Sequence, residues 1–355
     1  MKSLGIKPLS IAVLLSTGLL SGCFFEGEQS LEKMDTPPDK AAVSNSDMDS
    51  TTVQTDKEKT DGEETSKGTV SRDIYLLDSN GLVVPQTLEL PASKEVALQS
   101  LQYMVKDGPV TELLPEGFQA VLPAGTEIKG INLKDGTLTV DVSKEFGEYA
   151  PKDEKKILQA LTYTLTQFDN VERLKLWIDG KEQNTMPVNG SPITEGVSRS
   201  DGINIQVGDQ TDLVNSEAVT VYFPSQNDQQ IYDVPVTTRV KKADDTYETV
   251  VQALLDGPEL GTALQQPFNE EAELLSTDLK DGVLTLTFNE GILSGEKPKA
   301  IADEALSSLV LSLTEMKEVE AVQIKVEGAD EVFNESGQPL TEPVTRADIT
   351  AAKSL

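Results

Sequence analysis

An internal repeat is the feature of this sequence that most constrains its fold. The stretch LKDGTLTVDV, residues 133–142, returns as LKDGVLTLTF at residues 279–288. Other landmarks recur in the same order at offsets of 146 to 150 residues, among them VKDGP with LLDGP and PITEGVSRSD with PLTEPVTRAD. A chain of 355 residues with such a repeat is expected to fold as two similar units rather than around one large core.

The N-terminal segment predicts export and a lipid anchor. Lys2 and Lys7 precede an apolar run, residues 9–20, which is shorter than the roughly 20 residues of a membrane-spanning helix and resembles a signal-peptide core. The run ends in LSGC, typical of a bacterial lipoprotein signal, in which the thiol of Cys23 takes up a diacylglycerol. A plain secretory signal with an incidental Cys is the alternative. We expect a diacylglycerol on Cys23, to which an N-acyl chain can be added, no other cofactor, and a position on the extracytoplasmic face of the cell membrane.

Residues 24–71 have few aliphatic side chains, no periodicity and many charged or hydroxyl side chains. Such a segment cannot bury enough apolar area to offset its ordering entropy, so it predicts a disordered acidic tether. Together with the repeat, this segment defines the predicted organisation: signal peptide 1–22, lipid-anchored tether 23–71, unit one 72–204, linker 205–218 and unit two 219–351.

Local patterns predict the same elements in both units. Each begins with a β segment that ends at Val-Pro (Val84-Pro85, Val234-Pro235), followed by an amphipathic helix with Ser93 or Asp245 as its N-cap and Gly-Pro after its end. A hairpin around Asp-Gly, a second helix (153–168, 299–316) and an alternating strand complete the unit. This order predicts an α+β fold of two tandem small units, each an open, mostly antiparallel sheet with helices on one face.

Composition excludes several classes of function. The chain contains no His and one Cys, which rules out a Ser-His-Asp triad, a Cys-His pair and a His-ligated zinc site. The net charge of -30 repels phosphates, so we expect no nucleic acid partner. We also predict no metal site and no enzymatic activity.

The lipoprotein signal, the acidic tether and two units that carry VYFP, DVPVTTRV, LLDGP and LKDGVLTLTF resemble the GerM family of sporulation and germination lipoproteins, which are built from two GerMN domains. The resemblance covers essentially the whole chain, although VPQTLELP in unit one lacks the Arg of VPVTTR. It implies a role in endospore formation and germination and a fold similar to the ring-building domains of secretion systems. It also implies action as an assembly factor beside the channel proteins that join mother cell and forespore.

The repeated Asp135-Gly136 and Asp281-Gly282 are predicted to be hairpin turns, because both residue types accept positive φ. The alternative is a carboxylate used in sugar chemistry. A glycosidase needs two carboxyl groups at a set separation, and nothing nominates such a pair among 60 acids. DSNG at residues 78–81 resembles a fragment of a calcium loop but lacks the later ligands, so it also predicts a turn.

Arg199 and Arg346 recur at the end of each unit and are expected to clamp the C-terminal segment onto its domain, with a ligand-binding Arg as the alternative. The only Trp, Trp177, is expected on the same polar side of its strand as Arg173 and Lys175, opposite the apolar side chains at 174, 176 and 178. Either a helix or the neighbouring unit covers this Trp, or the three residues belong to a partner-binding surface.

The charge is unevenly distributed. Residues 72–204 hold 20 acidic and 13 basic side chains, whereas residues 205–355 hold 28 and 10. The usual cause of such an excess is a solvated, soluble surface. The sharper hypothesis is that the second unit meets a basic partner and the first lies near the membrane or wall. Our interpretation is a lipoprotein that binds sporulation envelope or channel proteins as an assembly or stabilising factor and that can oligomerise. The alternatives are a peptidoglycan-active enzyme that uses carboxylates only and a passive cell-wall binding module.

Overall fold

The computed structural model describes residues 68–206, 214–227, 230–242, 245–294 and 300–353. The predicted signal peptide, Cys23 and nearly all of the predicted tether lie outside the described residues. The first strand begins at Thr69, within the range predicted as tether, and the first strand of unit two begins at Ser216, within the range predicted as linker.

Unit one combines a hairpin, two helices and a four-stranded sheet. The hairpin is β1 (Thr69–Leu77) with β2 (Val83–Pro91), and the sheet has the order β3-β4-β5-β6. The remaining elements are α2 (Val96–Gln102), β3 (Ile128–Lys134), β4 (Thr137–Val142), α3 (Glu154–Leu165), β5 (Arg173–Ile178), β6 (Lys181–Glu182) and the 3-10 turns Pro109–Glu112, Lys144–Gly147, Pro151–Asp153 and Arg199–Asp201.

Unit two repeats this plan. Its hairpin is β7 (Ser216–Gln226) with β8 (Ile231–Lys241), and its sheet has the order β14-β13-β10-β9. The remaining elements are α4 (Thr246–Asp256), β9 (Leu274–Lys280), β10 (Val283–Phe288), the 3-10 turn Glu290–Ile292, β11 (Leu293–Ser294), β12 (Ala300–Ile301), α5 (Asp303–Leu313), β13 (Ala321–Val326), β14 (Val344–Thr345) and α6 (Arg346–Lys353).

Each unit has three layers, because its second helix lies between the hairpin and the sheet. Helix α3 contacts β1, β2 and β5, and α5 contacts β7, β8 and β13. The alternating strands turn their apolar side chains toward these helices and bury them, as the sequence predicts (Leu138, Val140, Val142, Leu284, Leu286, Phe288). The threonines between them are only partly covered, so the opposite face of each sheet is open.

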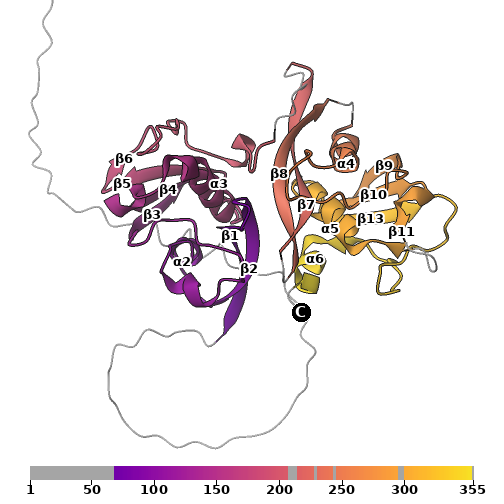
Figure 1. The fold of residues 1–355 in the computed structure, drawn as a ribbon, viewed down its shortest axis with the longest axis horizontal. Coiled ribbons are helices and arrows are strands. Elements are labelled where there is room, and N and C mark those ends of the chain that lie inside the picture. The colour runs from indigo at the N-terminus through magenta and orange to yellow at the C-terminus, as the bar shows by residue number, and fades with distance from the viewer. Residues whose placement is uncertain (1–67, 207–213, 228–229, 243–244, 295–299, 354–355) are drawn as a thin grey trace, which may run out of the picture.

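The two hairpins lie next to each other in the middle of the molecule, with the four-stranded sheets on the outside (Figure 1). Strands β2 and β8, which are equivalent in the repeat, contact each other. The described part of the chain is therefore two layered units joined hairpin to hairpin, with the two open sheet faces at a distance from the joint.

The predicted α+β class with two tandem units is confirmed. Most strand pairs are antiparallel, but β4 with β5 and β10 with β13 are parallel, because a helix crosses over between them. Asp245 is confirmed as the N-cap of α4, where its Oδ1 accepts the N–H of Tyr247 at 2.8 Å.

Two local expectations were wrong. The first strands do not end at Val-Pro: Pro85 pairs with Tyr75 inside β2, and Pro235 pairs with Tyr222 inside β8. Proline lacks an N–H but is tolerated on a strand with a free edge, and both hairpins have only two strands. Ser93 is not the cap of α2, which begins at Val96 after Glu95.

Candidate functional site

The repeated Asp-Gly pairs form the two-residue turns between β3 and β4 and between β9 and β10. Asp135 and Asp281 have φ of 48° and 49°, and Gly136 and Gly282 have φ of 74° and 79°. Positive φ at both positions is the geometry of a type I′ hairpin turn, which matches the twist of the strands it joins. The carboxylates occupy exposed turns rather than a cleft.

Asp78 of the DSNG segment also serves a turn. Its Oδ1 accepts the N–H groups of Asn80 and Leu82 at 2.9 and 2.8 Å. Its Oδ2 accepts the hydroxyl of Tyr232 from unit two at 2.9 Å, and the ring of Tyr232 packs edge-on against Phe118 of unit one. This buried carboxylate is therefore part of the contact between the units.

Arg346 fastens the last helix of unit two to α5. Its Nη2 donates to the carbonyl of Leu311 at 2.8 Å and its Nε donates to the hydroxyl of Thr314 at 3.2 Å. Arg199 makes the matching contacts in unit one, with the carbonyl of Tyr163 and the hydroxyl of Thr166 on α3, at 3.3 and 3.0 Å.

Both arginines meet on one carboxylate of unit two. Arg199 Nη1 lies 2.6 Å from Glu315 Oε2, and Arg346 Nη2 lies 2.7 Å from Glu315 Oε1. The hydroxyl of Tyr222 donates to the same Oε1 at 2.7 Å. The rings of Tyr163 and Tyr222 lie 4.7 and 5.2 Å from the guanidinium carbons of Arg199 and Arg346, within cation–π range. These five residues are the joint cluster.

The charged groups of the joint cluster stabilise one another although the cluster is largely buried. Burial alone would raise the pKa of Glu315, but Arg199, Arg346 and the hydroxyl of Tyr222 outweigh it and hold that pKa below its usual value. Burial, followed by the charge of Glu315, raises the pKa of Tyr222 well above its ordinary value. Glu315 is thus ionised and Tyr222 remains a hydrogen-bond donor at neutral pH.

The same position in unit one carries a different residue. Gln167, just after the end of α3, corresponds to Glu315, just after the end of α5, and the amide of Gln167 donates to the carbonyls of Asp73 and Thr164 at 2.7 and 2.6 Å. The repeat therefore preserves the arginine clamp in both units but supplies the carboxylate only once. Arg199 consequently reaches across the joint for its ion pair.

Asn204 connects the two hairpins directly. Its amide nitrogen donates to the carbonyls of Val83 on β2 and Pro235 on β8, at 2.7 and 2.8 Å. Its Oδ1 accepts the N–H of Val83 at 2.9 Å. One side chain thus bridges the backbones of β2 and β8.

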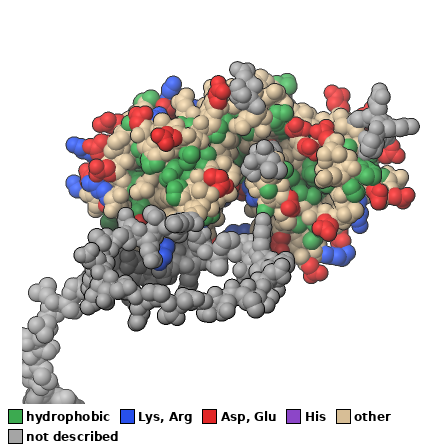
Figure 2. All heavy atoms as spheres, turned by 90° about the horizontal axis from the view of Figure 1, so that it is seen from below, with side chains coloured by type: hydrophobic (Ala, Val, Ile, Leu, Met, Phe, Trp, Pro, Cys, Tyr) green, Lys and Arg blue, Asp and Glu red, His purple; other side chains and the backbone are tan. Residues whose placement is uncertain are grey.

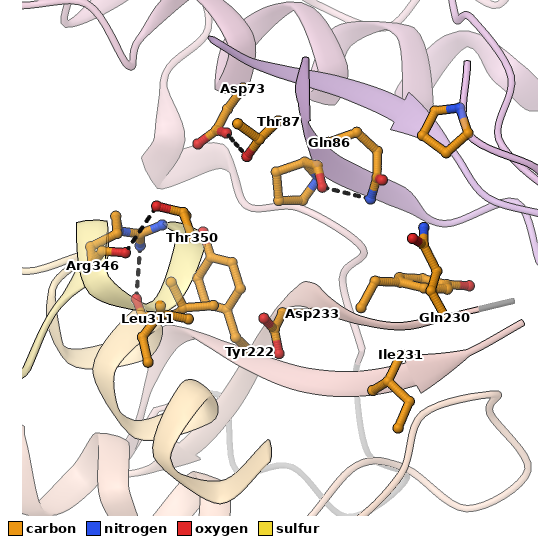
Figure 3. A pocket seen from close by; sticks show the side chains of 14 residues that line it. Asp73, Gln86, Thr87, Tyr222, Gln230, Ile231, Asp233, Leu311, Arg346 and Thr350 are labelled. Atoms are coloured by element: carbon orange, nitrogen blue, oxygen red, sulfur yellow. Dashed lines mark hydrogen bonds between the residues drawn. The ribbon is translucent and has the colours of Figure 1, made fainter. Parts of the chain in front are cut away.

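A cleft opens beside the joint cluster, between the two units. Its volume is about 200 Å³, and its walls come from β1 and β2 of unit one and from β8, α5 and α6 of unit two. Figure 3 shows Asp73 and Gln86 on one side, with Asp233 and Ile231 on the other and Arg346 at one end. No pattern along the sequence indicated this cleft, because its walls are far apart in the chain.

The predicted partner surface lies on the open face of β5. Trp177 is 37% exposed, on the side of β5 opposite the buried Leu174 and Leu176. Lys175 forms an ion pair with Glu182 of β6 at 2.8 Å, and Arg173 donates to the carbonyls of Glu195 and Gly196. Arg173 therefore holds the neighbouring loop, whereas Trp177 presents its ring to the outside.

The open face of unit two differs from that of unit one. The position that matches Trp177 is Lys325, and residues 329–332 and 339–341 border a groove of about 710 Å³ over this face. In Figure 2 Lys and Arg side chains gather at the outer end of unit one, where β5 and β6 lie, whereas Asp and Glu side chains predominate over unit two.

A second difference between the units is the buried carboxylate of Glu154, at the start of α3. It accepts the N–H groups of Val188, Asn189 and Ser191 and the hydroxyl of Tyr149, at 2.6 to 3.2 Å. Burial raises the pKa of this carboxyl, but these hydrogen bonds outweigh it and lower the pKa to about 2. The matching residue in unit two is Ala302.

Within the described residues, no group of three or more Cys, Asp and Glu side chains is placed to hold a metal ion. No helix in the described part of the chain has the length and apolar character needed to cross a membrane.

Comparisons with known proteins agree with the two-unit architecture. A family model described as "Germane: Sporulation and spore germination" matches residues 73–184 and 220–332. Spore germination protein GerM of Bacillus subtilis (strain 168) is 42% identical over 353 residues, covering 96% of both chains. The solved tandem GerMN domains of the sporulation protein GerM from Bacillus subtilis align with a TM-score of 0.73 and 44% identity, over 78% of this chain and 98% of that chain.

Proposed function

Because this chain belongs to the Germane family of sporulation and spore germination proteins, with tandem GerMN domains, we propose that it is a lipid-anchored extracytoplasmic protein. In this proposal it binds other proteins and helps to assemble or stabilise a complex of the spore envelope or of the channel between mother cell and forespore. The descriptions of the family and of these relatives name a process rather than a reaction.

The observation that carries this proposal is the joint. Glu315 binds arginines of both units, and Asn204 binds strands of both hairpins, so the two units are held together by buried polar contacts. A protein built in this way presents two open sheet faces at a set spacing, which suits a connector between other proteins. Open sheet faces and edges are surfaces that proteins use for recognition.

The exposed Trp177 is the contact that we assign to unit one. Aromatic side chains with neighbouring arginines are frequent energetic centres of protein interfaces. Glu182 is the residue opposite Trp177 on the neighbouring strand β6, and its carboxylate forms an ion pair with Lys175. The exposed part of Trp177 can therefore contribute apolar area to a partner.

The test is site-specific photocrosslinking in sporulating cells. The crosslinking amino acid benzoylphenylalanine replaces Lys181 on β6, near Trp177, and in a matched control it replaces Glu248 on the exposed side of α4. We expect a discrete adduct from position 181, strongly reduced by Trp177→Ala, and no corresponding adduct from position 248. Equal adducts from both positions, or an adduct that Trp177→Ala leaves unchanged, would contradict the proposed surface.

The anchor and the alternatives have separate tests. Cys23→Ala should move the chain out of the membrane fraction, and unchanged retention would contradict the lipoprotein signal. Incubation of the purified chain with peptidoglycan is expected to release no soluble fragments. Release that one Asp or Glu substitution abolishes would favour the carboxylate enzyme, and co-sedimentation with purified sacculi would favour the wall-binding module.

A further inference from the structure

We propose that unit two binds an extended, basic segment of a partner protein, which adds as a strand to the outer edge of β13 in the groove over its sheet. This inference rests on the proposed protein-binding function and gives unit two a contact of its own, beside the one that we assign to Trp177 in unit one. The family description and the names of the relatives assign no ligand to this groove.

The strand that follows β5 in unit one has no counterpart after β13 in unit two. The turn Asp179-Gly180 has φ of 51° and 73°, the geometry of a type I′ turn, and β6 returns along β5. The matching turn in unit two is Glu327-Gly328, in which only Gly328 has positive φ, 79°. Residues 329–331, which match β6 and the residue after it, form no strand and border the groove instead.

The side chains that join β5 to β6 have also changed. In unit one Lys175 forms an ion pair with Glu182 across the two strands, at 2.8 Å. The matching residues in unit two are Gln323 and Asp330, and because Gln323 is neutral they cannot form an ion pair. Unit two therefore lacks both the turn and the ion pair that hold the added strand in unit one.

The backbone of Ile324 faces the outer edge of β13. Ala321 and Glu327 donate their N–H groups to carbonyls on the β10 side, at 3.2 and 2.8 Å, so the odd-numbered residues bond toward β10. Successive residues of a strand direct their N–H and C=O groups to opposite sides, so those of Ile324 point outward. Strand β14 pairs with β13 only at residues 321 and 322, and among the described residues no backbone segment pairs with Ile324 at this edge.

The groove of about 710 Å³ lies along this edge. Ile324 and Val326 both border the groove, and because their side chains are buried against the helix side, they face it with their backbone. The side-chain amide of Gln323 donates to the carbonyls of Ile324 and Leu340, at 3.4 and 3.3 Å. These hydrogen bonds are long, so a backbone N–H of an entering strand, at the usual distance of about 2.9 Å, can replace the amide at Ile324.

Unit one shows how such a strand bonds. The carbonyl of Leu176, which matches Ile324, accepts the N–H of Gln183 at 2.9 Å. An extended segment in the groove of unit two would make the same hydrogen bond to Ile324. Addition of a peptide strand to an open sheet edge is a common recognition mode, in which the main chain supplies affinity and the side chains supply specificity.

The charges around the groove favour a basic segment. Residues 327–345 contain five acidic side chains and no basic one. All five are exposed: Glu327, Asp330, Glu331, Glu335 and Glu342. Among the residues that border the groove, Asp330 and Glu331 outnumber the single basic side chain, Lys325. A segment with lysine or arginine is therefore attracted to this edge, whereas an acidic segment is repelled.

The experiment uses the full chain, purified in detergent and labelled with ¹⁵N at isoleucine. The probe is the basic peptide acetyl-KTKVKTK-amide. One control is acetyl-ETEVETE-amide, and the other is the basic peptide with all its backbone nitrogens methylated, which keeps the charge but cannot donate to a strand. We expect the basic peptide, at millimolar concentration, to move the amide signal of Ile324 downfield saturably, because its N–H gains an acceptor. Ile178, at the edge that β6 already covers, should not respond.

Three results would overturn the proposal. The first is no saturable shift of Ile324 with the basic peptide. The second is an equal shift with the methylated peptide, which would show attraction by charge without strand pairing. The third is an equal shift with the acidic peptide, which would reject a basic segment as the occupant.

The deciding variant combines Asp330→Asn with Glu331→Gln, because both side chains are exposed and the amides preserve their shapes. It should weaken binding of the basic peptide by about threefold or more, as expected for the loss of two exposed charge pairs. Glu248→Gln, an exposed change on α4, should leave the affinity unchanged. Unaltered affinity in the double variant, or an equal loss in Glu248→Gln, would reject the acidic border of the groove as the source of its preference.

The outcomes separate this inference from the proposed function. The peptide probe requires no partner protein, so a negative result together with persistent crosslinking at position 181 rejects only the groove. Loss of crosslinking at position 181 with intact peptide binding rejects only the contact assigned to Trp177.

Discussion

Units one and two have the same helix-and-arginine clamp but differ in what surrounds it. In both, an arginine near the end of the unit binds a carbonyl and a threonine hydroxyl of the second helix. Unit two adds Glu315 beside this clamp, whereas unit one has Gln167 there and a buried Glu154 at the other end of the helix. The duplicated parts build each unit, and the parts that diverged connect the units or hold a loop.

The largest effect is expected from Glu315→Gln, which tests whether the joint depends on one carboxylate. The change leaves two largely buried guanidinium groups without an ion pair, and removal of one partner of a buried pair costs about 3 to 5 kcal/mol. The free energy of unfolding, measured in urea, should fall by about 3 kcal/mol, toward the lower limit because both arginines retain some solvent contact. Gln167→Ala, the matched change in unit one, removes two neutral hydrogen bonds and should cost only about 1 to 2 kcal/mol.

The same variant can be examined unit by unit. Trp177 is the only Trp, so its fluorescence follows unit one, whereas far-ultraviolet circular dichroism follows both units. The two unfolding curves should coincide in the original chain and separate in Glu315→Gln, with unit two unfolding first because its own clamp loses an ion pair. Separate curves in the original chain would show that the joint does not couple the units.

Glu154→Gln is expected to have the next largest effect and to act on unit one alone. The neutral amide cannot accept all four donors as well as the carboxylate, so the free energy of unfolding should decrease by about 2 kcal/mol at neutral pH. The folded pKa of about 2 lies below the unfolded value of about 4.3, so the carboxylate contributes its full stability above pH 4.3. This contribution should decline as the pH falls through that window and vanish below pH 2, where both chains would then have similar stability.

Asp135→Ala and Asp281→Ala should have smaller and equal effects, since both residues adopt the same positive φ in the same turn. Alanine adopts this conformation at a cost of roughly 1 to 2 kcal/mol. Asp→Asn at either position should be nearly neutral, because asparagine suits the same turn. Markedly unequal losses of thermal stability between the two units would indicate a role for one Asp beyond the turn.

The smallest effects on stability are expected on the two open sheet faces. Trp177→Ala and Lys325→Ala should each change the free energy of unfolding by no more than about 0.5 kcal/mol, as is usual for surface positions. Only Trp177→Ala should reduce crosslinking to a partner. A large stability loss in Trp177→Ala would instead indicate that the ring packs within unit one.

The elements of each unit could be predicted because their signals are local. Asp-Gly at a strand junction, Asp245 before α4 and the alternation of Leu138 and Val140 each depend on neighbours a few residues away. The strands through Pro85 and Pro235 were misjudged because a proline usually ends a ladder. Here each strand pairs with only one other strand, so its second edge joins no ladder in which an N–H would be required.

The joint could not be predicted in the same way. Arg199 and Glu315 are 116 residues apart and belong to different units, and no periodicity relates one unit's surface to the other's. One signal was available: Gln167 and Glu315 occupy the same place in the repeat, beside clamps that are otherwise alike. The charge at Glu315, where the other copy has the neutral Gln167, indicated that unit two makes a contact there that unit one does not make.

The contact between the equivalent strands β2 and β8 bears on how such a chain can evolve. A homodimer of one unit, related by a twofold axis, would also bring equivalent strands together, but every residue would then occur on both sides of the axis. Any acid at position 315 would be duplicated at position 167. Covalent fusion of the two copies removes this restriction, so that one carboxylate can serve two arginines and each outer face can specialise for a different neighbour.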